Sequence, residues 1–253
     1  MNPNNNSKIS TYFIYFSIIF STVFCQPTKT EYLITTAKIS AFLYTQYGLH
    51  TDVPNNISTQ KPNDFDAKIR SNLRWKNNGD IAKKLSDVLL YGFFVGGIPL
   101  SPLLTKNNYM NTLLTNLEVL SINGLVTNII KHAVKRQRPY SHYGTFPDND
   151  DSYRSFFSGH TSTAFAIGTS TAMTLTRNSN LNENLLWGSI LCTATMTGYL
   201  RIAADKHYAT DVITGAIVGT LIGGFINNRN VNRFNKTHGI SYRDNGLYIY
   251  VRL

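Results

Sequence analysis

Basic residues and histidines recur in three short stretches of the sequence, and their types suit the transfer of one phosphoryl group. The stretches are Lys131–Pro139, Ser158–His160 and Arg201–Asp211. Among their residues are three widely separated cations, two histidines with a carboxylate four residues after the second, and a Ser-Gly turn that can offer backbone N–H groups; they are Lys131, Arg138, Arg201, His160, His207, Asp211, Ser158 and Gly159. Phosphoryl transfer requires cations for the charge on the oxygens, a nucleophile, and an acid for the leaving group. The three stretches in this order therefore predict a pocket for a phosphoryl group.

The first stretch supplies two cations at a spacing that suits a helix. Lys131 and Arg138 are seven residues apart, so they share one face if a helix persists between them. Pro139 is expected to end that helix and to leave Arg138 at its end, where the guanidinium can hold two phosphate oxygens. Taken alone, the stretch also suits a solvated basic helix end beside Lys135 and Arg136.

The second stretch precedes an apolar run rich in Thr and Ala, and predicts a helix N-terminus that binds an anion. Ser158 is expected to cap this helix and to contact the anion, and Gly159 lets the backbone approach it closely. His160 then lies in the first helical turn, where it can act as general acid. Taken alone, the stretch also suits an ordinary serine cap beside a surface histidine.

The third stretch carries the expected nucleophile. Arg201 and His207 are six residues apart, which places Arg201 at the end of one helix and His207 at the start of the next. Asp211 is four residues beyond His207, so the carboxylate can accept a hydrogen bond from one imidazole nitrogen and leave the other free to attack phosphorus. Taken alone, this is also the spacing of a simple helical His–Asp pair.

The three patterns resemble those of the type 2 phosphatidic acid phosphatase superfamily, which includes lipid phosphatases, bacterial class A acid phosphatases and vanadium-dependent haloperoxidases. The motifs of that family are Lys-x6-Arg-Pro, Pro-Ser-Gly-His and Ser-Arg-x5-His-x3-Asp. The first is intact here, whereas Phe157 replaces the usual proline of the second and Leu200 the usual serine of the third. The resemblance covers about Leu85 to Ile226 and keeps every charged or reacting residue.

By motif position, the resemblance implies that His207 attacks and becomes phosphohistidine, that Asp211 orients it, and that His160 protonates the leaving group. The phosphate-binding residues that it implies are Lys131, Arg138, Ser158, Gly159 and Arg201. It also implies an α-helical core with the three motifs at one end. No metal or other cofactor is expected, because the fixed cations supply the electrostatic stabilisation.

Long apolar runs separated by short polar loops predict an all-α fold, a helical bundle of about five to six core helices with the phosphate pocket at one end. The runs are Leu85–Leu104, Asn111–Ile130, Ser155–Thr176, Leu185–Ile202 and Val212–Ile226, with an earlier helix expected at Thr30–Tyr47. Gly215, Gly219 and Gly223 recur every four residues, a spacing that lets two helices approach closely.

Composition divides the chain into four predicted parts. They are a signal peptide at 1–25, a polar and partly helical segment at 26–84, the helical domain at 85–228, and a tail at 229–253 with a short β-like strand pair. The apolar stretch Ile9–Phe24 follows a single charge, Lys8, and has the length of a signal rather than of a membrane span. A loop is predicted at Thr51–Asp66, and Cys192, in an apolar run, is expected to be buried.

Charge and hydropathy suit a membrane surface as well as a soluble bundle. The net charge is +10 and the mean hydropathy is −0.16, yet several apolar runs approach the length of a membrane span. The scattered Lys and Arg residues argue against nucleic acid as a partner. We expect a phosphorylated lipid or small phosphate ester as partner, and membrane association with a periplasm-facing site in a bacterial cell envelope. A soluble periplasmic protein is the alternative.

The sequence thus favours a metal-independent phosphatase that acts on phosphate monoesters or diphosphates of lipids through a phosphohistidine. A soluble periplasmic acid phosphatase of broad specificity and a vanadate-dependent haloperoxidase are the alternatives, and a non-catalytic envelope protein is a third class. The short chain, without large insertions around the motifs, argues against the haloperoxidase, and the complete set of reacting residues argues against the non-catalytic protein. Asp148, Asp150 and Asp151 could gather a cation, but such a cluster is more often a solvated loop.

Overall fold

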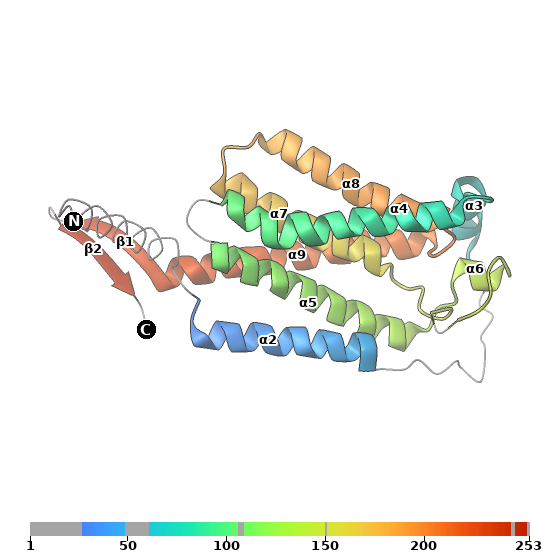
Figure 1. Ribbon diagram of the computed structural model, residues 1–253, viewed down its shortest axis with the longest axis horizontal. Helices are drawn as coiled ribbons and strands as arrows, with labels where there is room; N and C mark the ends of the chain where they lie inside the picture. The colour runs from blue at the N-terminus through green and yellow to red at the C-terminus, as the bar shows by residue number, and fades with distance from the viewer. Residues whose placement is uncertain (1–26, 49–60, 106–108, 150, 244–245, 252–253) are drawn as a thin grey trace, which may run out of the picture.

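The computed structural model describes residues 27–48, 61–105, 109–149, 151–243 and 246–251, and has the all-α core that the sequence predicts (Figure 1). Long helices lie side by side along the molecule. They are α2 (Lys29–Leu43), α4 (Gly79–Gly92), α5 (Tyr109–Val134), α7 (Gly159–Asn178), α8 (Glu183–Ala203) and α9 (Ala209–Thr237). The predicted signal peptide at 1–25 lies outside the described residues.

Shorter elements cover the two ends of the bundle. They are η1 (Tyr44–Gly48), α3 (Asp64–Leu73), η2 (Phe93–Leu100), η3 (Ser101–Leu104), α6 (Pro139–His142), β1 (His238–Arg243) and β2 (Gly246–Val251). The strands pair antiparallel with Ile240 opposite Ile249, in the segment where the sequence predicts a strand pair. They lie at one end of the molecule, and α3 and α6 lie at the other (Figure 1).

The apolar runs of the sequence correspond to the observed helices, and local signals set several of their ends. Asn182 caps α8 by accepting a hydrogen bond from the N–H of Leu185. The first run changes at Phe93 from an α-helix to the π-helix η2, which contains Gly97 and Pro99, and ends in the 3-10 turn η3. Glycine and proline disfavour a regular α-helix, which accounts for the break.

Two local predictions are wrong. The segment Thr51–Asp66 was predicted to be a loop, but α3 begins inside it at Asp64, after an Asn63 cap whose side chain accepts from the N–H of Asp66. Helix α5 also does not reach Arg138: it ends at Val134, and Lys135 has a left-handed φ of 49° that turns the chain. Lys131 and Arg138 therefore do not share a helix face.

Glycines bring the backbones of α9 and α7 into direct contact. A Cβ added at Gly219 would lie 2.1 Å from the carbonyl oxygen of Ser162, and one at Gly223 would lie 2.3 Å from that of Ala166. At Gly215 the nearest atom would be the carbonyl oxygen of Ser158, at 2.8 Å. The close approach that the glycine spacing predicts is thus present, and it places the start of α7 beside the start of α9.

Substitution of Gly219 by alanine is expected to destabilise the protein, because the added methyl group would collide with the backbone of α7. The cost should be about 1–3 kcal/mol, as for other overpacked cores. Gly188→Ala is the matched control, since nothing lies within 4 Å of a Cβ there and alanine favours a helix. Thermal unfolding in detergent should show a lower midpoint for Gly219→Ala alone. Equal midpoints would contradict the packing argument.

Hydrogen bonds between buried polar side chains join the helices internally. Asn116 of α5 donates to the carbonyl oxygen of Gly97 (2.7 Å) and accepts from the hydroxyl of Ser170 (2.9 Å). Asn227 of α9 donates to the hydroxyl of Thr174 (2.7 Å). The Ser, Thr and Asn residues that lower the mean hydropathy therefore point inward, where they bind neighbouring helices.

Large apolar side chains point outward instead. On α9, Ile213, Ile217, Leu221 and Phe225 recur every four residues and are 49–68% exposed. In the part of the chain that the structure describes, three segments are long and apolar enough to cross a membrane: Gly79–Leu104, Tyr109–His142 and Ala209–Asn230. Cys192 is also exposed, so the prediction that it is buried is wrong. This distribution, apolar outside and polar inside, supports membrane association.

Candidate active site

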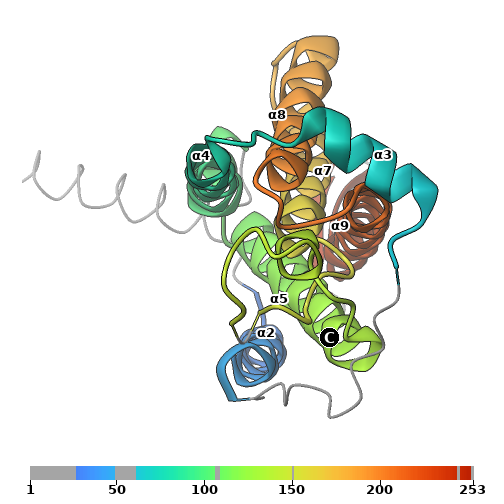
Figure 2. The ribbon, with the colours of Figure 1, turned by 90° about the vertical axis from the view of Figure 1, so that its right-hand side faces the viewer.

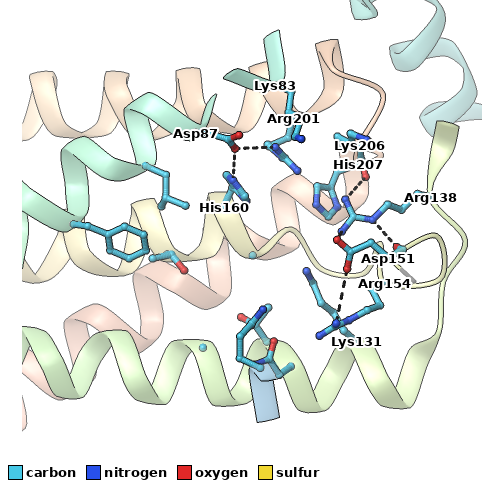
Figure 3. Close-up of a pocket in the computed structure, with 18 of the residues that line it drawn as sticks. Lys83, Asp87, Lys131, Arg138, Asp151, Arg154, His160, Arg201, Lys206 and His207 are labelled. Atoms are coloured by element: carbon cyan, nitrogen blue, oxygen red, sulfur yellow. Dashed lines mark hydrogen bonds and ion pairs between the residues drawn. The ribbon is translucent and has the colours of Figure 1, made fainter. Parts of the chain in front are cut away.

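A cavity of about 500 Å³ lies near the end of the bundle that carries α3 and α6. Six of the predicted site residues line it: Lys131, Arg138, Gly159, His160, Arg201 and His207 (Figure 3). They come from α5, the loop before α6, the start of α7, the end of α8, and the loop before α9. Ser158 and Asp211 are fully buried behind the lining and are not part of it.

The two arginines are held rigidly in the cavity wall. Arg138 is 5% exposed, and its Nε donates to the carbonyl oxygen of Asp151 (2.8 Å). Arg201 is 4% exposed, and its Nη1 donates to the hydroxyl of Ser86 (3.1 Å). The Nε of Arg201 is buried without a hydrogen-bond partner among the described residues. Buried donors without partners are costly, so this wall is suited to an anion.

The start of α7 presents backbone to the cavity, and Ser158 serves as its cap. The Ser158 hydroxyl accepts from the N–H of Thr161 (3.4 Å) and from the Thr161 hydroxyl (2.9 Å). The predicted cap is therefore present, but the described structure does not place this side chain in the cavity wall. A Cβ at Gly159 would lie 3.5 Å from the Nζ of Lys131, so glycine keeps the backbone open beside this cation.

His207 is fixed in one tautomer with one nitrogen unused. It is 1% exposed, and its Nδ1 lies 2.8 Å from the carbonyl oxygen of Ser155, which can only accept. Nδ1 therefore carries the proton, and Nε2 keeps its lone pair. Burial, followed by the charges of Arg138 and Arg201, lowers the pKa of His207 well below its usual value. The ring is thus neutral at physiological pH, with a lone pair on Nε2.

The predicted hydrogen bond from His207 to Asp211 is not formed. The closest approach, from Nδ1 of His207 to Oδ2 of Asp211, is 3.7 Å, and the carbonyl oxygen of Ser155 is the nearer acceptor. The spacing argument fails because His207 lies in the loop before α9, not on the helix itself. Oδ2 of Asp211 accepts instead from the hydroxyl of Ser155 (2.6 Å) and the N–H of Tyr208 (2.9 Å).

The predicted general acid has a partner that the sequence argument missed. Nε2 of His160 lies 2.8 Å from Oδ1 of Asp87 on α4, and Nη1 of Arg201 lies 3.5 Å from the same oxygen (Figure 3). Burial lowers the pKa of His160 to about 4, Arg201 acts in the same direction, and Asp87 opposes both. With Nε2 bonded to Asp87, Nδ1 is the nitrogen left to exchange a proton with a substrate.

Replacing Asp87 by asparagine is expected to shift the pH profile. The neutral amide no longer offsets burial and Arg201, so the pKa of His160 falls further. An acid is lost as the pH rises above its pKa, so the basic limb should move to lower pH. At neutral pH the turnover of phosphate esters should fall on the order of tenfold. Asp80→Asn, in the exposed first turn of the same helix, is the control. An unchanged profile would show that Asp87 does not act on His160.

Further charged residues surround the predicted ones. Lys83, Arg154 and Lys206 also line the cavity, and none of them belongs to the three motifs. Asp151, considered above as a cation ligand, pairs instead with Arg138 and Arg154 at 3.8 Å each. Within the described ranges, no group of three His, Cys, Asp or Glu residues could hold a metal. The cavity therefore carries a clear excess of positive charge.

The same cavity also has apolar lining residues. These side chains come from α2, α4, η2 and α5, and are Phe42, Leu90, Tyr91, Phe94 and Leu120. The two departures from the resembled motifs, Phe157 and Leu200, lie elsewhere: both are buried and neither is a lining residue. Leu200 packs against Ala82 of α4, so it joins α8 to the helix that carries Asp87. One cavity thus combines a cationic end with an apolar side.

Comparison with known proteins identifies the domain. Residues 112–234 match the model of the PAP2 superfamily. The chain carries a PAP2 superfamily domain. The match spans α5 to α9 and so includes every motif residue, but it leaves out α2, α3 and α4. Among solved structures, the PAP2 domain and its surroundings resemble a transmembrane PAP2 type phosphatidylglycerolphosphate phosphatase from Bacillus subtilis. That comparison has a TM-score of 0.54 and 18% identity, and covers 78% of this chain and 96% of the other.

Curated relatives of the PAP2 domain include proteins that are named as lipid phosphatases. Lipid phosphate phosphatase 1 from Arabidopsis thaliana is 30% identical over 130 residues, which covers 41% of this chain and 40% of that protein. Lipid A 1-phosphatase from Porphyromonas gingivalis is 32% identical over 106 residues, which covers 41% of this chain and 20% of that protein. The chain thus matches less than half the length of each.

Proposed function

We propose that this protein is a metal-independent phosphatase that hydrolyses phosphate monoesters or diphosphates of lipids through a phosphohistidine intermediate. The observation that carries the proposal is that the cavity has both a cationic end and an apolar side. A phosphorylated lipid complements both parts of the cavity, because its phosphate is anionic and its chains are apolar. The names of the relatives, lipid phosphate phosphatase and lipid A 1-phosphatase, agree with this class of substrate.

In the first step, Nε2 of His207 attacks phosphorus and the bond from phosphorus to the leaving oxygen breaks. His160, protonated on both nitrogens, gives the Nδ1 proton to that oxygen while Asp87 retains the other. A bound phosphoryl dianion favours the protonated form of His160, because it offsets the charges of Arg201 and Lys131. The products of this step are the free lipid alcohol, or the shortened phosphate, and phosphohistidine.

In the second step, water attacks the phosphorus of phosphohistidine. His160, now neutral, takes one proton from the water, and the bond between Nε2 and phosphorus breaks. Lys131, Arg138 and Arg201 bind the equatorial oxygens in both steps, with the free N–H groups at the start of α7. Inorganic phosphate leaves and the starting state of His207 is restored.

The membrane placement that we propose puts the cationic end of the cavity at the surface of the bilayer, on the periplasmic side. The apolar stripe of α9 and the three candidate spans then face lipid. In cell fractionation without detergent, the protein should sediment with the membranes. Release with the soluble periplasmic contents would instead support the soluble acid phosphatase.

A phosphate-release screen tests the activity itself. Purified protein is offered phosphatidate, phosphatidylglycerol phosphate, an isoprenyl diphosphate and a soluble ester such as p-nitrophenyl phosphate, with and without EDTA. We expect the lipids to be preferred, EDTA to have no effect and vanadate to inhibit. A preference for the soluble ester would favour the broad-specificity acid phosphatase. Halide oxidation that depends on added vanadate would favour the haloperoxidase.

A further inference from the structure

Helix α3 lies outside the PAP2 match, yet it is bonded to the loops that carry the site. It crosses the end of the bundle beside α8 and α9 (Figure 2). Asp205, which precedes His207 by two residues, accepts from Nε of Arg70 (2.6 Å) and from its Nη2 (2.7 Å). Asp205 has a left-handed φ of 59°. The paired bonds from α3 therefore hold the backbone between Arg201 and His207 in a turn that non-glycine residues rarely adopt.

A second connection from α3 leads to the interior. Asp66 is fully buried, and its Oδ1 accepts from the N–H of Thr210 (2.9 Å). Its Oδ2 accepts from the Thr210 hydroxyl (2.7 Å) and from Nη2 of Arg136 (2.7 Å). Arg136 belongs to the spacer of the first motif, which taken alone also suits a solvated basic helix end, but here it is bonded inside the protein.

Arg136 bridges two buried carboxylates. Its Nη1 donates to Oδ1 of Asp211 (2.6 Å), while Nη2 donates to Asp66, and the guanidinium lies 4.4 Å from the centre of the Tyr208 ring. Ser155 connects Asp211 to His207. Its hydroxyl donates to Asp211, and its backbone carbonyl oxygen accepts from Nδ1 of His207. A continuous chain of hydrogen bonds thus runs from α3 to the imidazole.

We propose that Asp66 is a positioning residue for catalysis, which keeps a net negative charge behind His207 by balancing Arg136. The carboxylates of Asp66 and Asp211 and the guanidinium of Arg136 together carry a net charge of −1. Without Asp66, the pair of Asp211 and Arg136 would carry no net charge. When Nε2 bonds to phosphorus, the ring keeps the Nδ1 proton and becomes positively charged. A negative charge behind the ring stabilises that state, and a neutral pair does not. The inference rests on the proposed phosphatase activity.

Asp66→Asn tests this, because asparagine has almost the same shape and removes the charge. Its NH2 group also replaces one of the two acceptor oxygens, so the charge is separated from this change by the variants described below. We expect kcat to fall on the order of tenfold, because one negative charge behind the His207 ring is lost. KM should stay within about twofold, since Asp66 is not a cavity residue. Asp64→Asn is the matched control: the same change two residues away, at an exposed carboxylate of the same helical turn.

A double variant separates charge from packing. Asp66→Asn combined with Arg136→Gln leaves Asp211 as the one charge of the group and so restores the net charge of −1. Its kcat should therefore exceed that of Asp66→Asn alone. A double variant that is equally slow or slower would overturn the proposal, because a role in packing alone predicts further loss.

Folding and activity controls keep the outcomes distinct. All variants are compared by thermal unfolding in detergent, and Asp66→Glu, which keeps the charge, serves if the asparagine variant does not fold. Its kcat should lie within about threefold of the unchanged protein, and a loss of tenfold or more would contradict the role of the charge. Absence of phosphate release by the unchanged protein would instead refute the proposed function.

Discussion

His207→Ala is expected to abolish phosphate release, with a loss on the order of 10⁴-fold or more. The substitution removes Nε2, the nitrogen that forms the bond to phosphorus in the proposed first step. The carbonyl oxygen of Ser155 fixes the proton of His207 on Nδ1 and so keeps the lone pair on Nε2. The measurement is the rate of phosphate release from a lipid phosphate in detergent micelles.

The control is His142→Ala, a histidine of α6 that does not line the cavity. Its activity should equal that of the unchanged protein. The covalent intermediate can be sought in parallel: His160→Ala, given p-nitrophenyl phosphate with its good leaving group, should accumulate an acid-labile phosphoprotein. That label should be absent when His207 is also replaced. Release by His207→Ala at an undiminished rate would exclude the phosphohistidine mechanism.

Arg138→Gln is expected to lower kcat/KM on the order of a hundred- to a thousandfold. The guanidinium is 5% exposed and is held by the backbone carbonyl of Asp151, so its position does not have to be created when the substrate binds. Such preorganised charge acts most strongly on the transition state, in which the oxygens carry the spread charge. Glutamine keeps much of the side-chain length and loses the charge.

Lys135→Gln is the control for Arg138, since it removes a cation from the same stretch of chain at an exposed position outside the cavity lining. Its effect should be less than about threefold. A similar loss in both variants would mean that the overall basic charge attracts the substrate, and that Arg138 has no specific contact with it. In that case kcat/KM of the two variants would also depend on salt concentration to the same extent.

Mean hydropathy alone could not distinguish a membrane-associated bundle from a soluble one, because it counts polar residues without regard to whether their side chains point inward or outward. Polar side chains inside the bundle lower the mean hydropathy although they face other helices. Asn116 of α5 bonds to Ser170 of α7, and Asn227 of α9 bonds to Thr174 of α7. Ile217 and Leu221 point outward on α9. The same composition is compatible with a soluble bundle or a membrane one, and the packing of α7 against α9 decides which residues face out.

Helix α3 was missed because its contacts are ionic and not apolar. Sequence patterns reveal helices through apolar periodicity, but the buried residue of α3 is Asp66, and Arg70 and the C-cap residue Arg74 pair with Asp205. The one local signal was Asn63, whose side chain caps the helix. A polar segment of this kind becomes a helix through partners that lie far along the chain.

The sequence by itself determined the chemical inventory: the cations, the two histidines, the α7 cap and the glycines that bring α7 against α9. Such features depend on residue types and on spacings within one helix, which obey local rules. The tertiary structure alone decided that Ser155 fixes the His207 tautomer, that Asp87 binds His160, and that Arg136 joins Asp211 to α3. Those contacts join residues that lie 52, 73 and 75 positions apart, so they arise only when the helices pack.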